Sequence, residues 1–275
     1  MKTFPRQQFV LPGIGPILEI RTTLDSTLPY AEHFHSSFSF GLILSGRTRF
    51  FLGKEAHLAE VGDIVLVAPE QVHSCNPVGK GSRSYQMTHV NAEWFHRHMG
   101  LILHQQQGIC IKKPLIRDAG LFAEAQALLD AVCAGSAENE NDLAELLSKM
   151  HTLHQCFLPV VNTSGRDASA LAESFLAERI MEGASSVSAL AHAAGVRRES
   201  FSRSFRRTTG LPPSNYLHCL RLEYGRHLLQ EGRSIAEAAI ASGYVDQSHF
   251  HRMFVKYYSV TPGNYKKSQS HPYKK

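Results

Sequence analysis

Two stretches in the last third of the chain carry side chains that can hydrogen-bond to the edges of DNA bases. Each stretch has two phenylalanines four residues apart, Phe201 and Phe205 in the first and Phe250 and Phe254 in the second. A helix turns about 100° per residue, so if both phenylalanines of a pair point inward, polar side chains occupy the opposite face. These polar side chains are Glu199, Ser202 and Arg203 in the first stretch, and Gln247, Ser248, His251 and Arg252 in the second. Arginine can bind guanine and glutamine can bind adenine, so we expect both faces to read base edges.

The two stretches belong to an internal repeat. Val187–Gly195 aligns with Ile235–Gly243 at an offset of 48 residues, and the phenylalanine pairs align at an offset of 49. Each copy predicts a short Ala-rich helix, a turn at the glycine and a second helix, which is the layout of a helix-turn-helix. A solvated, charged helix face is the alternative interpretation of either copy alone. The same arrangement found twice favours DNA binding.

The segment between the two copies predicts a single helix. Ser214 can cap its N-terminus, and Gly232 follows its last residue, Glu231. Such a helix is about 26 Å long at ~1.5 Å per residue. With the thickness of the flanking helices, it separates the two polar faces by about 34 Å, one turn of DNA. We therefore expect the helices near residues 198–207 and 247–256 to enter two successive segments of the major groove.

Charge is distributed unevenly along the chain. Residues 1–165 carry 13 Lys and Arg against 15 Asp and Glu, a net charge of −2, whereas residues 166–275 carry 16 against 9, a net charge of +7. A basic segment of this kind indicates a polyanionic partner. Candidate phosphate contacts lie near the ends or flanks of the predicted reading helices: Arg197, Arg206, Arg207, Lys256, Lys266 and Lys267.

The first third of the chain has the pattern of antiparallel β structure. Short apolar runs alternate with turn-forming pairs such as Ser45-Gly46 and Gly62-Asp63, at a spacing of about 8–12 residues. We expect a sandwich or small barrel with strands near residues 17–22, 38–44, 48–52, 56–58, 63–68 and 83–90.

After Pro114 the apolar pattern becomes helical. One apolar stripe runs from Leu121 to Val132 and a second from Leu143 to Phe157. These helices can cover the β structure, form a dimer, or do both with different faces. Because the stripes exceed what one covering face needs, we expect a homodimer, with Leu146 and Leu153 as candidates for the side chains that face the partner.

Several motifs of the repeat match one known family. They are the two turn glycines, Phe201-Ser-Arg-Ser-Phe205, Phe250-His-Arg-Met-Phe254, residues 209–216 and residues 260–265. With these motifs, residues 170–267 resemble the DNA-binding domain of the AraC/XylS family of transcription regulators. The resemblance implies a sequence-specific regulator that binds double-stranded DNA and RNA polymerase. Ser259 stands where the family usually has a glycine, so we expect the second reading helix to be capped less well at its end.

The first half resembles the cupin sensor domain that this family often carries, in His33-Phe-His35, in Gly62–Pro69 and in His73. Enzymatic cupins bind metal through a His-x-His pair, a carboxylate a few residues later and a further histidine. Here Ser36–Ser39 stands where the carboxylate is expected, so we predict no metal, no cofactor and no catalytic residue. The resemblance implies instead a small-molecule effector inside the barrel. We expect it to contact His33, His35, Phe40 and His73, with Arg21 or Tyr85 as further candidates.

These patterns together predict a two-domain α+β chain. Its parts are a cupin-like β-barrel or jelly roll over residues 1–110, a helical dimerisation or covering segment over 111–160, a linker over 161–169 and a double helix-turn-helix domain over 170–275. No apolar run approaches the roughly 18 residues of a membrane span, and the five cysteines never form a CxxC pair. We therefore expect a cytoplasmic protein that contacts no membrane. The predicted function is a ligand-responsive transcription activator. The alternatives are a metal-dependent cupin enzyme and a DNA-binding regulator controlled by protein contact.

Overall fold

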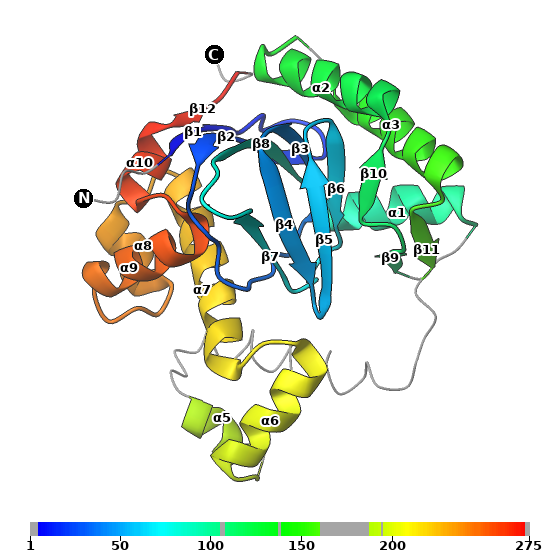
Figure 1. The fold of residues 1–275 in the computed structure, drawn as a ribbon. Helices are drawn as coiled ribbons and strands as arrows, with labels where there is room; N and C mark the ends of the chain where they lie inside the picture. The colour runs from blue at the N-terminus through cyan, green and yellow to red at the C-terminus, as the bar shows by residue number, and fades with distance from the viewer. Residues whose placement is uncertain (1–4, 105–107, 137–138, 160–186, 194, 273–275) are drawn as a thin grey trace.

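The computed structural model describes residues 5–104, 108–136, 139–159, 187–193 and 195–272 (Figure 1). A β-rich unit is followed by a helical unit, which confirms the predicted fold class. The predicted linker over residues 161–169 and the beginning of the predicted DNA-binding domain lie outside the described residues.

The β-rich unit is built mainly from two sheets, whose strands pair antiparallel except for β1 and β12, which run parallel. The larger sheet has the order β10 (Leu115–Arg117), β6 (Asp63–Val67), β3 (Phe38–Ser45), β8 (Arg83–Val90), β2 (Ile17–Ser26), β1 (Arg6–Val10) and β12 (Gln269–Ser270). The smaller sheet has the order β5 (Glu55–Glu60), β4 (Arg47–Leu52) and β7 (His73–Pro77). Ile43, Phe50 and Tyr85 belong to one buried cluster that joins the two sheets, so the sheets enclose a barrel interior.

Three helices cover the outer face of the larger sheet: α1 (Ala92–Ile102), α2 (Ala119–Cys133) and α3 (Asn139–His154). They share one core with outward-facing side chains of β3, including Phe40. Leu146 is 3% exposed within this core, so the prediction that it faces a partner is wrong, whereas Leu153 is 63% exposed. β10 also extends the larger sheet, and β9 (Ile109–Ile111) pairs with β11 (Phe157–Pro159). Residues 111–136 and 139–159 therefore form one unit with the barrel.

Both copies of the predicted repeat form helix-turn-helix units. They consist of α5 (Val187–Ala193) with α6 (Arg198–Thr209), and of α8 (Ile235–Ala241) with α9 (Gln247–Tyr258); α7 (Pro213–Gln230) lies between them, and α10 (Pro262–Lys267) follows. Gly195 (φ 67°) and Gly243 (φ 79°) adopt the left-handed conformation that the turns require. Phe250 and Phe254 are fully buried. Figure 1 shows α5 and α6 at one end of α7, and α8 and α9 towards its other end.

The end of helix α9 differs chemically from the end of α6. Ser259 adopts the left-handed conformation (φ 53°) that Gly210 (φ 81°) adopts after α6. Its N–H donates to the carbonyl of Val255 at 2.9 Å, so the helix end is still capped by the backbone. This conformation is strained for a residue that has a side chain, so the protein is less stable with Ser259 than it would be with glycine at this position.

The two units pack against each other. Phe9 and Phe34 of the β-rich unit belong to the core of the C-terminal helices. The ring centroids of Phe9 and Tyr265 lie 4.6 Å apart, and those of Phe34 and Tyr216 lie 4.4 Å apart. After α10 the chain also adds β12 to the sheet beside β1. The packing therefore combines a shared apolar core with a shared sheet.

Candidate effector cavity and nucleic-acid interface

A cavity inside the barrel extends to the C-terminal helices. Half of its lining residues come from β2, β3, β7 and β8, and Arg226 of α7, Tyr258 of α9 and Tyr265 of α10 line it from the helical unit. The cavity leaves about 80 Å³ for the centres of water-sized molecules. A cavity needs only about 10–15 Å³ to hold one water, so this cavity has room for a small organic molecule. Both units therefore contribute to one site.

Four histidines lie together in this cavity, His33, His35 and His73 as predicted and His89 in addition. The ring centroids of His33 and His73 lie 4.3 Å apart, those of His35 and His73 4.9 Å, and those of His35 and His89 4.8 Å. In His33 and His73, Nδ1 lies 2.9 Å and 2.8 Å from the backbone carbonyl oxygens of Ala31 and Gln71. Because a carbonyl can only accept, Nδ1 carries the proton and Nε2 of each ring is an acceptor.

The histidines are neutral near pH 7. Burial lowers the pKa of His33 to about 3, with a further contribution from His73, and burial lowers the pKa of His73 to about 4. Burial also holds the pKa values of His35 and His89 well below the usual value. No group of three or more His, Cys, Asp or Glu side chains among the described residues is arranged to hold a metal ion. The cluster therefore offers hydrogen-bonding groups to a ligand.

The structure corrects one of the predicted lining residues. Phe40 packs beneath the helices on the outer side of the larger sheet, and its neighbour Gly41 lines the cavity together with Ile43. Successive side chains of a strand point to opposite faces, so the predicted position was wrong by one residue. Arg21 and Tyr85, the two further candidates, both line the cavity.

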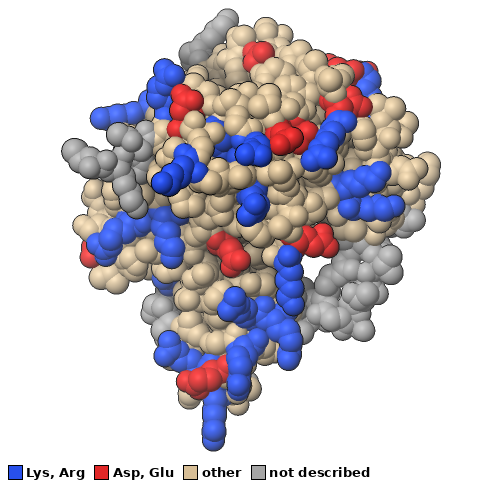
Figure 2. All heavy atoms as spheres, viewed as in Figure 1, with Lys and Arg blue, Asp and Glu red and all other residues tan. Residues whose placement is uncertain are grey.

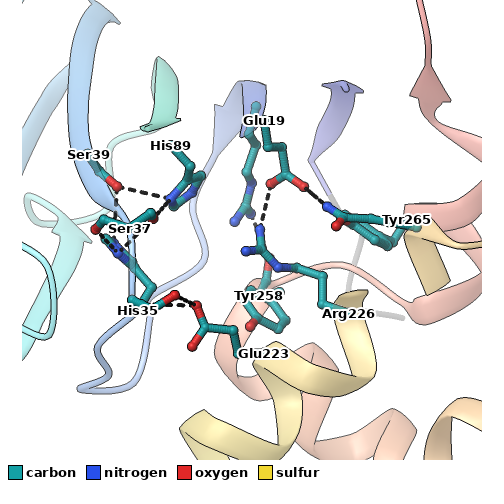
Figure 3. A network of polar contacts seen from close by, with 12 residues as sticks. Glu19, His35, Ser37, Ser39, His89, Glu223, Arg226, Tyr258 and Tyr265 are labelled. Atoms are coloured by element: carbon teal, nitrogen blue, oxygen red, sulfur yellow. Dashed lines mark hydrogen bonds and ion pairs between the residues drawn. The ribbon is translucent and has the colours of Figure 1, made fainter. Parts of the chain in front are cut away.

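A buried carboxylate of the barrel binds three side chains of the helical unit (Figure 3). Glu19, on β2, accepts hydrogen bonds from Arg226 Nη1 at 2.9 Å, from Gln230 Nε2 at 3.1 Å and from the Tyr265 hydroxyl at 2.6 Å. Glu19 is 2% exposed. Burial alone would lower the pKa of Arg226, but Glu19, together with Tyr265, Tyr258 and Glu223, outweighs burial and the pKa is raised. Ion pairing thus joins the two units at the cavity.

Two further polar contacts link the units near the cavity. The backbone N–H and the hydroxyl of Ser36 donate to Glu223 of α7 at 3.0 Å and 2.7 Å. Arg21 Nη2 donates to the carbonyl of Tyr258 at 2.6 Å. No pattern in the sequence indicates Glu19, Arg226 or Glu223, because their pairing depends on how the two units pack.

The predicted base-reading side chains lie on the accessible faces of α6 and α9. Glu199 and Arg203 of α6 are exposed and Ser202 is half-buried; the four candidates on α9, Gln247, Ser248, His251 and Arg252, are exposed. In Figure 2, Lys and Arg side chains gather at the lower end of the molecule, where α6 lies. In this arrangement neither reading face is covered by the barrel.

The predicted phosphate-binding side chains fall into two groups. Arg197, Arg206, Arg207, Lys256 and Lys267 are exposed. Lys266 is half-buried, and its Nζ donates to the carbonyls of Gly232 and Arg233 at 3.0 Å and 2.5 Å. Lys266 therefore stabilises the turn after α7 and has fewer donors free for a phosphate.

Two exposed valines precede the reading helices at equivalent positions of the repeat. Val245 is 83% exposed and Val196 is 46% exposed. Apolar side chains at a reading surface can contact the methyl group of thymine. The two valines are aligned in the internal repeat at the offset of 49 residues, so the repeat could have indicated both positions from the sequence.

Comparison with known proteins agrees with this architecture. Residues 23–153 match the model of the AraC-like ligand binding domain, and residues 190–268 match that of a helix-turn-helix domain. The chain belongs to the AraC family of transcription regulators. It is 24% identical over 224 residues to the HTH-type transcriptional regulator YbfI of Bacillus subtilis, covering 80% of this chain and 81% of that protein. Over 81 residues it is 35% identical to the activator RclR of Escherichia coli, covering 29% and 28% of the two chains.

The fold of this AraC-family regulator is similar to that of ToxT from Vibrio cholerae. The TM-score is 0.60 at 14% identity, with 97% of this chain and 98% of the ToxT chain covered. A ToxT structure with an unsaturated fatty acid bound gives 0.59 at 14% identity, with 96% and 95% covered. In the described part of this regulator, no helix has the length and apolar character needed to cross a membrane.

Proposed function

We propose that this regulator is a ligand-responsive activator whose effector occupies the cavity between the barrel and the C-terminal helices. The observation that carries the proposal is that Arg21 and His73 of the barrel and Arg226 and Tyr265 of the helical unit line one cavity. A ligand shifts an equilibrium only through its different affinities for the two states. A molecule that contacts both units binds best when they pack in one particular way. Its binding is thereby coupled to the position of the reading helices.

The likeness to ToxT supports an effector in the β-rich unit, since ToxT has been solved with an unsaturated fatty acid bound. In this regulator the volume of about 80 Å³ favours a compact ligand. Nε2 of His33 and of His73 can accept hydrogen bonds from such a ligand, because Nδ1 of each ring already donates to a backbone carbonyl. His35 is the third proposed histidine contact.

The C-terminal unit is proposed to bind double-stranded DNA with α6 and α9 in successive segments of the major groove, and to contact RNA polymerase. The exposed side of α3, which carries Leu153, is the proposed contact between two copies of the chain. The proposal places the protein in the cytoplasm and assigns it no catalysed reaction.

DNA reading is tested with duplexes selected from a random library by the full-length protein. Arg203→Ala and Arg252→Ala are each expected to weaken binding to the selected duplex by about 1–3 kcal/mol, and binding to random DNA much less. Arg49→Ala serves as the control, because Arg49 is an exposed arginine on β4 of the barrel. An equal loss on selected and random DNA would contradict base reading.

The effector site is tested by measuring the Kd for the selected duplex with and without a deproteinised, low-molecular-mass extract of the source cells. We expect the extract to change the Kd of the wild-type protein. Ile43→Phe adds volume to the cavity lining and is expected to abolish this change while leaving the Kd without extract unaltered. A response that survives the substitution would place the effector elsewhere.

A further inference from the structure

Arg83, the first residue of β8, is a buried charge without a counter-ion. Its side chain lines the cavity and is 0% exposed. Nη2 donates to the carbonyl of Cys75 at 2.7 Å, but Nε and Nη1 are buried without any hydrogen-bond partner. No ion pair between described residues includes Arg83. A guanidinium has five N–H donors, so most of the donors of Arg83 are free.

The other charged groups of the cavity do not neutralise Arg83. Glu19 is the one carboxylate among the lining residues, and Arg226 of the helical unit already binds it. Arg21 donates to the Tyr30 hydroxyl and to the carbonyl of Tyr258. The lining holds three arginines and one glutamate, and its histidines are neutral, so two positive charges are uncompensated. A buried charge without a partner is costly, and arginine binds carboxylates well.

The surroundings of Arg83 suit an anion with a short apolar part. Its guanidinium carbon lies 5.7 Å and 5.3 Å from the ring centroids of Tyr30 and Tyr85. Apolar side chains, including Ile43 and Met87, line the same cavity. Thr48 provides a second free donor there, because its buried hydroxyl has no partner. The open volume of about 80 Å³ suits a short chain.

We infer that the effector of this regulator is a small carboxylate whose charged group is bound by Arg83 inside the barrel. The inference rests on the proposed effector cavity, and it adds the charge of the ligand and the residue that anchors it. The apolar part of the ligand lies against Ile43 and Met87.

Calorimetry and thermal unfolding of the full-length protein test the charge of the ligand. The probes are butanoate and hexanoate, their primary amides, and inorganic phosphate. We expect both carboxylates to bind and to raise Tm, and the amides to bind at least tenfold more weakly, because an amide lacks the charge that Arg83 requires. Equal binding of acid and amide, or no binding of either carboxylate, would overturn the inference. Tighter binding of phosphate than of the carboxylates would overturn the carboxylate assignment.

The role of Arg83 is tested by Arg83→Met, with Arg49→Met as the exposed-arginine control. Without added anion, we expect Arg83→Met to unfold at a higher temperature than the wild type, because it removes an uncompensated buried charge. The variant should bind carboxylate and amide equally weakly, and Arg83→Lys should keep part of the preference for the acid. A lower Tm for Arg83→Met, or a retained preference for the acid, would assign Arg83 a structural role only.

The extract assay separates failure of this inference from failure of the proposed function. If the extract changes the DNA affinity of Arg83→Met as it does that of the wild type, the role of Arg83 is refuted and the effector cavity stands. If the extract changes the DNA affinity of neither the wild type nor Arg83→Met, the effector proposal itself fails.

Discussion

Replacing Glu19 by Gln should loosen the packing between the barrel and the helical unit. The substitution keeps the shape of the side chain and removes the charge that Arg226 needs. Glu19 is 2% exposed and the side chain of Arg226 is 14% exposed, so water can replace the lost ion pair only in part. Breaking a buried pair by removing one partner costs about 3–5 kcal/mol. We take the lower value, about 3 kcal/mol, because Arg226 keeps some access to water; it corresponds to roughly a hundredfold shift towards separated units.

Hydrogen exchange of the full-length protein measures this effect. We expect faster exchange at the β1–β12 pairing and along α7 in Glu19→Gln, and little change at the pairing of β3 with β6. Glu223→Gln is the matched control, since Glu223 also joins the units but is half-buried and bound only by Ser36 in the β-rich unit. Glu223→Gln should reduce the free energy of packing between the units by less than about 1 kcal/mol.

A double variant decides whether the charge pair causes the loss. Glu19→Gln combined with Arg226→Met removes both charges, and its packing should be closer to that of the wild type than that of Glu19→Gln alone. Two outcomes would show that the carboxylate does not hold the units together. One is a loss of packing free energy in the double variant that equals the sum of the losses in the single variants. The other is hydrogen exchange in Glu19→Gln that is no faster than in Glu223→Gln.

Three further outcomes are expected. The pKa of His73 is about 4 in the folded protein and about 6.5 in the unfolded chain, so the unfolded chain gains the proton first. Stability should therefore fall as the pH decreases from about 6.5 to about 4; His73 alone contributes about 2 kcal/mol of this fall at pH 5, and the other buried histidines add to it. Urea denaturation at pH 7 and pH 5 measures the fall, and His73→Gln should show a smaller one. Ser259→Gly should raise the free energy of unfolding by about 0.5–1 kcal/mol, because glycine adopts the left-handed conformation without strain; an unchanged or lower value would mean that Ser259 is not strained. Leu153→Glu should yield folded monomers in sedimentation experiments, since Leu153 is 63% exposed, and a persistent dimer would assign the contact to another surface.

The internal repeat made the helical unit predictable from the sequence. Its two turn glycines and its aromatic pairs are local features, and local features decide where each short helix begins and ends. The helix between the copies was predicted over residues 214–231 and lies at Pro213–Gln230. A pattern that occurs twice allows each copy to confirm the other.

The cavity could be predicted only in part. The resemblance to the cupin sensor domain indicated His33, His35 and His73, whereas Phe40 was assigned to the wrong face of β3 because one residue of register reverses every side chain. His89 lies two residues after Met87 on β8, and both line the cavity, so alternation along that strand could have indicated it. Arg226 has no such signal, since in the sequence it resembles any polar residue on a helix. Its partner Glu19 is 207 positions away.

The charges of the cavity also indicate the direction in which an anionic effector acts. Arg21 of the barrel and Arg226 of α7 repel each other, because each charge lies near the other in the packed arrangement. Glu19 offsets this repulsion at the contact between the units, but it leaves the excess positive charge of Arg83 in the same cavity. An anion bound at Arg83 therefore lowers the electrostatic cost of keeping all three arginines together. Such a ligand favours the packed arrangement over the separated one, and it should slow hydrogen exchange in the regions where Glu19→Gln accelerates it.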